Sequence, residues 1–441
     1  MIPDEMWLGL GGFAALLGLI ALRAPVGLAM LLVGAAGYIS IVDLSTFLNY
    51  LKTTPYHLFA SYTLSVVPMF ILMGALAERG GLARELFEAA NALVGHKRGG
   101  LAQGAMVGCT VFGAICGSSV ATTATMGRAC LPELRRHGYG PGVSAALLAV
   151  GGTLGVLIPP SVILVIYAIS TEQNIVKLFM ASTIPGFVAA AFYMAVIWLL
   201  ARRDPAAWPA LPKQPWPARL RALRGVWGIT AITVIVVAGL FAGIFTPTES
   251  AAVGCMLTWA LGALRGDIGL KQVAEALRGT AETTAMIFAI LLGAEVFNAF
   301  LALSQLPETA ALWVSESGLP PYGVLVVLLV FYIILGAVMD ELAMILLTLP
   351  VFFPVVTALD FGMTAEQTAL WFGVLVLTVV GIGLTAPPIG LNVFVIASMA
   401  RDVPIGRIYR GVLPFLATDI IRLALCVAFP ALSLWLVEVL G

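Results

Sequence analysis

The chain has 441 residues, of which 61% are hydrophobic and 10% charged, and its 23 basic residues balance its 23 acidic ones. About 25% of the residues of a soluble globular domain are charged, so this composition excludes an ordinary soluble protein. No basic tail or basic–aromatic patch indicates a nucleic-acid partner. Apolar runs near or above ~18 residues recur, and each can cross the ~30 Å hydrocarbon core of a bilayer. The chain is therefore predicted to be a multi-pass membrane protein in contact with lipid.

The basic residues predict which connections are cytoplasmic. The clearest of these is a linker at 204–225, which is rich in Arg, Pro and Trp and divides the chain into halves at 1–203 and 226–441. The first half begins with two predicted spans. An interfacial stretch at 43–57 and an inward span at 60–77 then lead to a cytoplasmic connection.

Residues 99–134 are small and apolar, but they do not fit a simple crossing. Basic residues flank both ends, at 96–98 and 135–137, and both flanks should be cytoplasmic. The stretch is therefore predicted to enter and leave the membrane by the same face. It forms a re-entrant hairpin whose tip lies near Gly117-Ser118-Ser119.

The next segment, 142–170, contains the proline pair Pro159-Pro160. A proline pair removes two backbone donors and clashes with the preceding turn, so the segment cannot be one continuous helix. Backbone groups freed within hydrocarbon are tolerated only where protein or a water-filled cavity satisfies them. A broken transmembrane helix is predicted, and such breaks indicate a transporter's binding site near the membrane midplane. A span at 179–200 then returns to the linker.

The second half repeats this order in the opposite orientation. A second re-entrant hairpin at 322–356 lies between acidic flanks and so enters from outside, with its tip near Asp340-Glu341. A second broken helix at 368–400 carries Pro387-Pro388, 228 positions after the first proline pair. The predicted fold is an all-α polytopic membrane protein, an inverted repeat with two re-entrant helical hairpins and two broken transmembrane helices, as in elevator-type transporters. Three spans precede this hairpin, at 226–244, 250–264 and 281–303.

The candidate substrate-binding residues are polar groups of the inner tip and of the two breaks. Hydroxyls and unpaired carbonyls gather at the tip, and a helix N-terminus after it would present N–H groups to a carboxylate. The alternative for the Ser/Thr run is hydrogen bonding to the backbone of its own helix. The predicted set is Ser118, Ser119, Thr122, Thr123, Pro159, Ser161 and Asn392.

The candidate cation-binding residues lie at both tips and at the second break. Hydroxyls, and carbonyls freed by prolines, are oxygen donors of the kind that coordinates Na⁺ in transporters. Acids within the membrane are functional candidates by default. Asp340 and Glu341 are adjacent, so we expect one to support a cation and the other to cap or pair, with a structural role as the alternative. The predicted set is Gly117, Ser119, Gly336, Asp340, Glu341, Gly383, Thr385, Ala386 and Pro387.

The remaining polar residues of the spans have simpler interpretations. Asp419 and Arg422 lie three apart on the last span, which predicts a structural ion pair. The five cysteines lie in or beside apolar segments without a CxxC motif, which predicts packing roles. The three histidines are scattered near predicted interfaces. The absence of a His or Cys cluster argues against an enzyme or a cofactor-binding membrane subunit.

Four segments carry a family resemblance: Phe112–Thr122, Gly155–Ser161, Gly243–Ala251 and Gly383–Asn392. Jointly they resemble the large membrane subunit of tripartite ATP-independent periplasmic (TRAP) transporters over essentially the whole chain. The resemblance implies an elevator-type secondary transporter in the bacterial inner membrane. It also implies import of a small organic acid, such as a C4-dicarboxylate or sialic acid, with Na⁺ as the coupling ion and no organic cofactor.

The same resemblance implies two partners. One is a periplasmic substrate-binding protein that delivers the acid. The other is a small membrane subunit of about four spans, which some family members fuse to the large subunit. Because this chain shows no such N-terminal extension, we expect the small subunit to be a separate chain.

Two alternative functions compete with this interpretation. An ATP-driven permease is disfavoured because the chain lacks a Gly-x-x-x-x-Gly-Lys-Ser/Thr loop, although such a loop could lie on another subunit. The nearer alternative is a stand-alone Na⁺- or H⁺-coupled dicarboxylate or ion transporter of a related two-hairpin fold. Dependence on a soluble receptor separates that alternative from a tripartite transporter.

Overall fold

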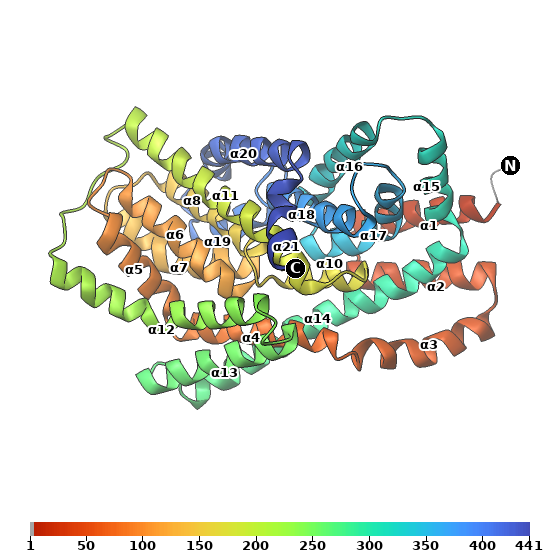
Figure 1. Cartoon of the computed structure of the whole chain (residues 1–441), viewed down its shortest axis with the longest axis horizontal. Helices are drawn as coiled ribbons and strands as arrows, with labels where there is room; N and C mark the ends of the chain where they lie inside the picture. The colour runs from red at the N-terminus through yellow and green to blue at the C-terminus, as the bar shows by residue number, and fades with distance from the viewer. Residues whose placement is uncertain (1–3) are drawn as a thin grey trace.

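The computed structural model describes residues 4–441, with side chains from Met6 onward, and every regular element in this part of the chain is helical. Five helices are long and apolar enough to cross a membrane, and there are up to seven spans if each of two bent helix pairs counts as one. The protein is therefore a multi-pass membrane protein (Figure 1). The five helices are α11 (Ile175–Arg203), α12 (Trp216–Phe241), α14 (Leu270–Leu303), α18 (Ala365–Gly383) and α20 (Ile405–Ala428).

Five α-helices and one short 3₁₀ helix precede the inner hairpin. The carboxylate of Asp43 accepts a hydrogen bond from the backbone N–H of Thr46 at 2.8 Å and so begins α3. The chain bends by 54° between α3 and the helix that follows it. This bend separates the predicted interfacial stretch from the predicted inward span. The elements are α1 (Asp4–Ala21), α2 (Val26–Ile41), α3 (Leu44–Phe59), η1 (Thr63–Ser65), α4 (Val66–Arg79) and α5 (Leu82–Val94).

The inner hairpin consists of α6 (Gly100–Cys116) and α7 (Ser119–Arg136), joined at the predicted tip. The first broken helix follows it. The two parts of this helix are bent by 43° around the proline pair, and the Pro159–Pro160 and Pro387–Pro388 peptide bonds are both cis. The first hairpin and the first break therefore lie where the sequence predicts them. The broken helix comprises α8 (Pro141–Gly152), α9 (Leu154–Leu157) and α10 (Val162–Ser170).

The second half contains the corresponding elements. The outer hairpin is formed by α16 (Pro321–Gly336) and α17 (Glu341–Thr357). After it, α18 ends at Gly383, and α19 (Leu391–Met399) begins beyond the second proline pair. The fold class predicted from the sequence is confirmed. The other helices of this half are α13 (Pro247–Arg265), α15 (Leu306–Glu316) and α21 (Ala431–Leu440).

Two helices extend beyond the predicted spans. Helix α12 begins at Trp216, so only 204–215 of the predicted linker at 204–225 lies outside helices. Pro215 and Pro217 flank this start, where proline is compatible with a first helical turn. Helix α14 likewise begins at Leu270 rather than at 281. In both cases the predicted span begins only after a charged segment, although that segment belongs to the same helix.

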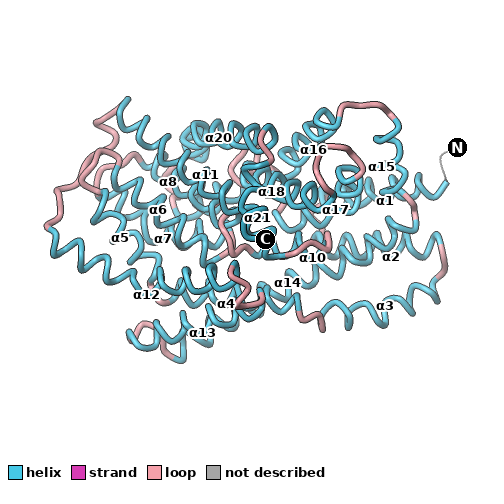
Figure 2. The backbone as a smooth tube through the Cα atoms, in the orientation of Figure 1, coloured by secondary structure: helices cyan, strands magenta, loops and turns pink. Residues whose placement is uncertain are grey.

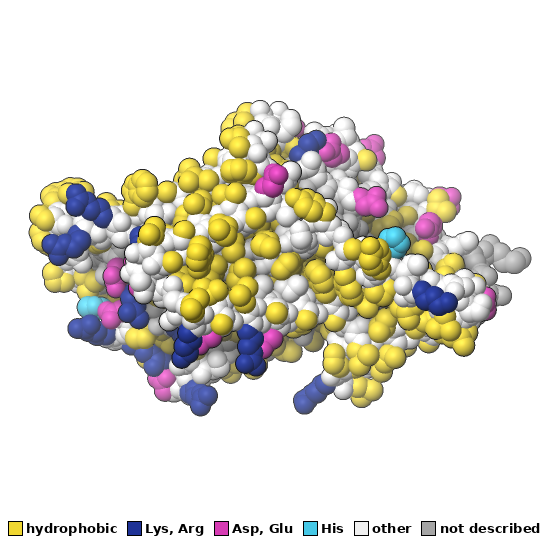
Figure 3. All heavy atoms as spheres, turned by 90° about the horizontal axis from the view of Figure 1, so that it is seen from below, with side chains coloured by type: hydrophobic (Ala, Val, Ile, Leu, Met, Phe, Trp, Pro, Cys, Tyr) yellow, Lys and Arg dark blue, Asp and Glu magenta, His cyan; other side chains and the backbone are white. Residues whose placement is uncertain are grey.

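The two hairpins enter the molecule from opposite ends. Figure 1 shows α6 and α7 toward the left end and α16 and α17 toward the right, and Figure 2 shows short loops between the helices. On the face shown in Figure 3, most Lys and Arg side chains lie toward the left end, and hydrophobic side chains cover the middle. By the positive-inside rule, the left end is predicted to be cytoplasmic. The opposite placement of the two hairpins (Figure 1) is the arrangement that the inverted repeat predicts.

A buried polar network crosses the core between the two broken helices. The predicted ion pair is confirmed, with Arg422 Nη2 2.8 Å from Asp419 Oδ1 and both side chains at most 2% exposed. Tyr193 donates to the other carboxylate oxygen of Asp419 at 2.7 Å, and its hydroxyl lies 3.1 Å from Thr153 Oγ1. Arg422 also donates to Thr378 Oγ1 at 3.4 Å. The network thus connects α11, α18 and α20 to the junction of α8 and α9.

Candidate functional site

The inner tip contacts the first proline break through its backbone. Gly117 has a φ of +63°, a conformation that favours glycine. A Cβ at this position would lie 2.9 Å from the carbonyl oxygen of Pro160. The Val162 N–H donates to the Gly117 carbonyl at 3.2 Å. The hairpin tip and the break are therefore held together by a close approach that a side chain would prevent.

Two helix N-termini meet at this junction. Ser118 caps α7, because its hydroxyl accepts a hydrogen bond from the Ala121 N–H at 3.4 Å. Ser161 caps α10 in the same way, accepting from the Leu164 N–H at 3.5 Å. The first N–H groups of a helix carry partial positive charge and favour an anion nearby. The junction therefore has the electrostatic character that a carboxylate requires.

Two buried threonines follow the inner tip on α7. Thr122 and Thr123 are both 0% exposed, and their hydroxyl oxygens have no hydrogen-bond partner within the described part of the chain. The broken helix provides the space that they occupy. A Cβ at Gly155 would lie 2.6 Å from Thr122 Oγ1, and one at Gly152 would lie 1.7 Å from Thr123 Oγ1. These glycines bring the α8–α9 backbone close to two unpaired oxygens.

The outer tip contacts the second break in a similar way. A Cβ at Gly383 would lie 2.5 Å from the backbone carbonyl carbon of Gly336, so the two helices meet backbone to backbone. The N–H groups of Ile389 and Gly390 lie 3.2 Å and 3.4 Å from the Ala337 carbonyl, to which both donate. Each hairpin is thus hydrogen-bonded to the broken helix of its own half.

The two adjacent acids of the outer tip have different roles. Asp340 caps α17, since one carboxylate oxygen accepts from the Leu342 and Ala343 N–H groups at 3.1 Å and 3.4 Å. Glu341 is 6% exposed, and its Oε2 has no partner among the described residues. The expectation that one acid caps while the other remains available fits this arrangement, with Glu341 as the available one.

Asn392 connects the two halves of the protein. Its side-chain amide nitrogen donates to Ser119 Oγ at 2.7 Å and to the Ala149 carbonyl at 3.1 Å. Ser119 lies at the inner tip and Ala149 on α8, whereas Asn392 lies in the first turn of α19. All three residues are 0% exposed, and Asn392 Oδ1 has no partner in the described structure. The structure therefore brings two predicted substrate residues, Ser119 and Asn392, into direct contact.

Other predicted residues have local roles. Just beyond the end of α18, the Thr385 hydroxyl donates back to the Gly381 and Ile382 carbonyls of that helix at 3.4 Å and 3.2 Å. This is the local pattern considered for the Ser/Thr run. The two breaks also differ in exposure, since Pro159 is buried and Pro387 is exposed, while Ala386 beside it is 6% exposed.

The donor set of both tips fits an alkali cation. Among the predicted site residues, the buried side-chain atoms without a partner are all oxygens, from Thr122, Thr123, Asn392 and Glu341. Among the described residues no group of three or more His, Cys, Asp or Glu side chains could hold a metal ion. Hydroxyl, amide and carbonyl oxygens beside interrupted helices are the ligands that Na⁺ takes in transporters. If Na⁺ binds, these oxygens would hold it.

Sequence reasoning missed polar partners that lie far apart in the chain. Tyr193 and Thr153 extend the predicted ion pair, and nothing in the local sequence of Tyr193 indicates this contact. Arg128 on α7 donates to the Glu78 carboxylate on α4. Here a signal was available, because Arg128 is a charged residue in the middle of a hairpin helix.

Opposed re-entrant hairpins, each docked on a broken helix in a polytopic all-α protein, define a membrane transporter rather than an enzyme. Residues 13–432 match the family described as the tripartite ATP-independent periplasmic transporter, DctM component. The chain belongs to this family, and it is a TRAP transporter large membrane subunit.

Several relatives support this assignment over most of their length. The C4-dicarboxylate TRAP transporter large permease protein DctM of Pseudomonas aeruginosa is 38% identical over 383 residues, which cover 86% of this chain and 87% of that protein. The sialic acid TRAP transporter large permease protein SiaM of Vibrio cholerae is 30% identical over 97% of this chain and 98% of its own. The ectoine TRAP transporter large permease protein TeaC of Halomonas elongata is 30% identical, with 96% and 97% covered.

Two solved structures share the fold at low sequence identity. The Alcanivorax borkumensis YdaH transporter aligns with a TM-score of 0.60 at 18% identity, covering 97% of this chain and 98% of that one. Neisseria gonorrhoeae MtrF, described within a class of antimetabolite efflux pumps, aligns with a TM-score of 0.60 at 16% identity, covering 100% and 96%.

Proposed function

We propose that this chain imports a small organic acid across the bacterial inner membrane, with C4-dicarboxylates as the first candidates. The family match over residues 13–432 is the observation that carries the proposal. The 38% identical relative named for C4-dicarboxylates supports the choice of cargo, and the relative named for sialic acid keeps other small carboxylates open. Two helix N-termini at the inner tip suit a carboxylate.

Sodium is the proposed coupling ion. Buried oxygens without partners occur at both hairpin tips, at Thr122 and Thr123 on one side and at Glu341 on the other. Desolvated oxygens of this kind are costly unless a ligand satisfies them. A Na⁺ ion would do so and would reduce the cost of burying an anionic cargo. Cation and acid are therefore expected to bind with positive coupling, typically ~1–3 kcal/mol.

The proposed movement is of the elevator type, with partners that complete the transporter. Each hairpin is hydrogen-bonded to its broken helix, and Asn392 joins the halves, so these elements are suited to move as one body. A periplasmic binding protein would deliver the acid. A separate small membrane subunit of about four spans would support the static elements.

The test is reconstitution of the chain with the small subunit in liposomes, with the soluble receptor outside. Uptake of labelled succinate, fumarate, malate and N-acetylneuraminate is measured with an inward Na⁺ gradient and with K⁺ in its place. Uptake that needs both Na⁺ and the receptor supports the proposal. Undiminished uptake without the receptor would instead favour a stand-alone two-hairpin transporter, and Na⁺-independent uptake would refute sodium coupling.

A matched pair of variants tests the site. Ser119→Ala removes the oxygen that Asn392 bonds, and Thr385→Val removes a second candidate ligand. Ser182→Ala is the control, since Ser182 is equally buried but bonds the Phe179 carbonyl of its own helix. The first two should raise the Na⁺ concentration for half-maximal uptake, and the control should not. Wild-type Na⁺ curves for both Ser119→Ala and Thr385→Val would show that these positions only pack.

A further inference from the structure

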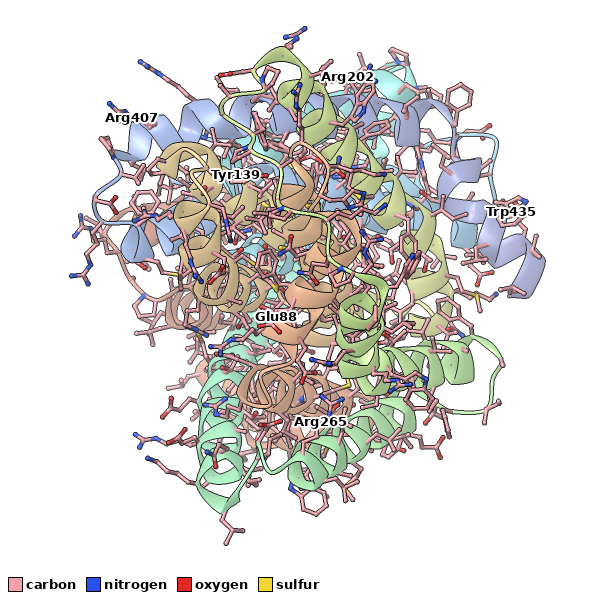
Figure 4. The ribbon with its side chains drawn as sticks, turned by 90° about the vertical axis from the view of Figure 1, so that its left-hand side faces the viewer. Glu88, Tyr139, Arg202, Arg265, Arg407 and Trp435 are labelled. Atoms are coloured by element: carbon pink, nitrogen blue, oxygen red, sulfur yellow. The ribbon has the colours of Figure 1, made fainter. Side chains whose placement is uncertain are left out.

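A polar cavity lies at the cytoplasmic end beside the inner hairpin. Its volume is about 620 Å³, and its walls come from the end of α4, the start of α5, the loop before α14, and α7. Thr125 and Arg128 are the polar residues that α7 contributes. Figure 4 views the molecule from this end and labels Glu88, another lining residue. We call this cavity the cytoplasmic vestibule.

One side of α7 connects the inner tip to the vestibule. Ser118, Thr122 and Thr125 are spaced four and three residues apart, so they follow one side of the helix, and Arg128 comes three residues later. With a rise of 1.5 Å per residue, Arg128 lies roughly 15 Å along the helix from the tip. A row of hydroxyls therefore leads from the candidate substrate site to a guanidinium group in an open cavity.

The Arg128 side chain is paired with a protein carboxylate in this structure. It donates to Glu78 of α4, and its Nη2 lies 3.5 Å from Thr125 Oγ1. The Arg128 side chain is 55% exposed and that of Glu78 33% exposed, so both remain accessible from the vestibule. One turn before Glu78, a Cβ at Gly74 would lie 3.0 Å from Cys116 Cα. Helix α4 thus contacts the hairpin at its tip and at Arg128.

The lining of the vestibule has a small excess of acids. Its lining contains the acids Glu78, Glu85, Glu88 and Asp267 and the bases Arg79, Arg84 and Arg128. Glu85 is paired with Arg265 at 2.6 Å, whereas Glu88 and Asp267 form no ion pair among the described residues. Arg79 lies 3.9 Å from Glu275, so an anion that leaves Arg128 would meet two acids, Glu88 and Asp267, and one base, Arg84, that are unpaired within the described part of the chain. This arrangement favours release to the cytoplasm over rebinding.

We propose that Arg128 binds the carboxylate of the departing acid on the cytoplasmic exit path, and that Glu78 is the competitor that displaces it. The inference rests on the proposed function, because it requires an acidic cargo. An unpaired arginine on the exit path would retain an anion through charge-assisted, bidentate hydrogen bonds. The Glu78 carboxylate takes the same donors, so the cargo is exchanged for a protein carboxylate rather than left bound.

The experiment uses the reconstituted complex with receptor outside, which selects correctly oriented molecules. Initial uptake of labelled succinate is measured against graded unlabelled succinate in the lumen, with chloride as the ionic-strength control. The variants are Glu78→Gln, Arg128→Gln and the double variant. The matched control is Asp402→Asn, which removes the acid that Arg135, another α7 arginine, contacts at 3.0 Å outside the vestibule.

Glu78→Gln should lower the lumenal succinate concentration that halves uptake by about two- to fivefold, the range that exposed ion pairs span. Arg128→Gln should raise it, the double variant should match Arg128→Gln, and Asp402→Asn should match wild type. If the ion pair between Arg128 and Glu78 only stabilised one conformation, both single variants would shift the curve in the same direction. That result would overturn the proposal. An unchanged Glu78→Gln curve, or a double variant that keeps the Glu78→Gln shift, would also overturn it.

These outcomes are distinguishable from a failure of the proposed function. Wild-type complex that takes up no acid in a receptor- and Na⁺-dependent manner would refute the proposed function, and this inference with it. Wild-type uptake with the wrong pattern among the variants would refute only the role of Arg128 and Glu78.

Discussion

Removing one partner of the buried ion pair between Asp419 and Arg422 should destabilise the protein far more than replacing both. Both side chains are at most 2% exposed. Asp419→Leu leaves a buried guanidinium whose remaining partner is Thr378 at 3.4 Å. Breaking a buried pair in this way costs roughly 3–5 kcal/mol, because an uncompensated charge remains in the core.

The double variant Asp419→Leu with Arg422→Met should recover most of that loss. Replacing a buried ion pair with apolar residues of similar volume is often neutral or stabilising. Tyr193→Phe removes one hydrogen bond to Asp419 and the contact with Thr153, and should have a smaller effect. Hydrogen bonds between membrane helices average ~0.6 kcal/mol in double-mutant cycles.

Thermal unfolding of the purified complex in lipid nanodiscs, followed by tryptophan fluorescence, gives the required ranking. Trp371 is a local reporter, since its indole N–H donates to the Cys426 carbonyl at 2.8 Å, one helical turn beyond Arg422. The expected order of unfolding temperatures is wild type, then Tyr193→Phe, with Asp419→Leu lowest and the double variant well above it. If the double variant unfolds as early as Asp419→Leu, the uncompensated charge is not the cause and the reasoning fails.

Gly383→Ala should abolish transport or assembly, because its Cβ would lie 2.5 Å from the Gly336 backbone, whereas Gly406→Ala, with nothing within 4 Å, should be silent in the same uptake assay. Equal activity of the two variants would contradict the close approach. The Arg135 side chain, by hydrogen bonding, lowers the pKa of Asp402 below its ordinary 3.8. The stability that this pair contributes is therefore present above pH 3.8 and lost as the pH falls through the lowered value, so wild-type and Asp402→Asn unfolding temperatures should converge in acid. A difference that persists at the lowest pH would refute this linkage. Replacing Na⁺ by K⁺ during purification should weaken protection of the hairpin tips in hydrogen exchange, and identical protection in both salts would argue against a cation there.

The broad fold could be predicted because membrane insertion leaves few options. Basic residues at 96–98 and 135–137 require both ends of the inner hairpin to be cytoplasmic. Pro159-Pro160 and Pro387-Pro388 prevent continuous helices. These constraints are local in sequence and act independently of tertiary packing. The boundaries at Trp216 and Leu270 were missed because a helix can continue into water, where hydropathy no longer reports it.

The candidate site was only partly predictable, because its contacts depend on tertiary packing. Ser119 and Asn392 were each selected as polar residues near an interruption, but their 2.7 Å contact depends on how the two halves pack. Asp340 is the N-cap because α17 begins at Glu341. The sequence alone did not show at which of the two adjacent acids the helix begins. Arg128 was recognisable as a charge within a hairpin helix, but Glu78 lies 50 positions away on another helix, so the partner could not be predicted from the sequence.

The hydrogen bond between Ser119 and Asn392 also bears on the ancestry of the two halves. Alignment of the proline pairs places Leu164 opposite Asn392, and alignment of the caps Ser118 and Asp340 places Glu341 opposite Ser119. An antiparallel dimer of one duplicated half-chain would form this bond twice or not at all. The present protein forms this hydrogen bond once, so its two halves have diverged and neither can take the place of the other. Each half alone contains only one of the two partners, so a dimer of either half could not form this hydrogen bond.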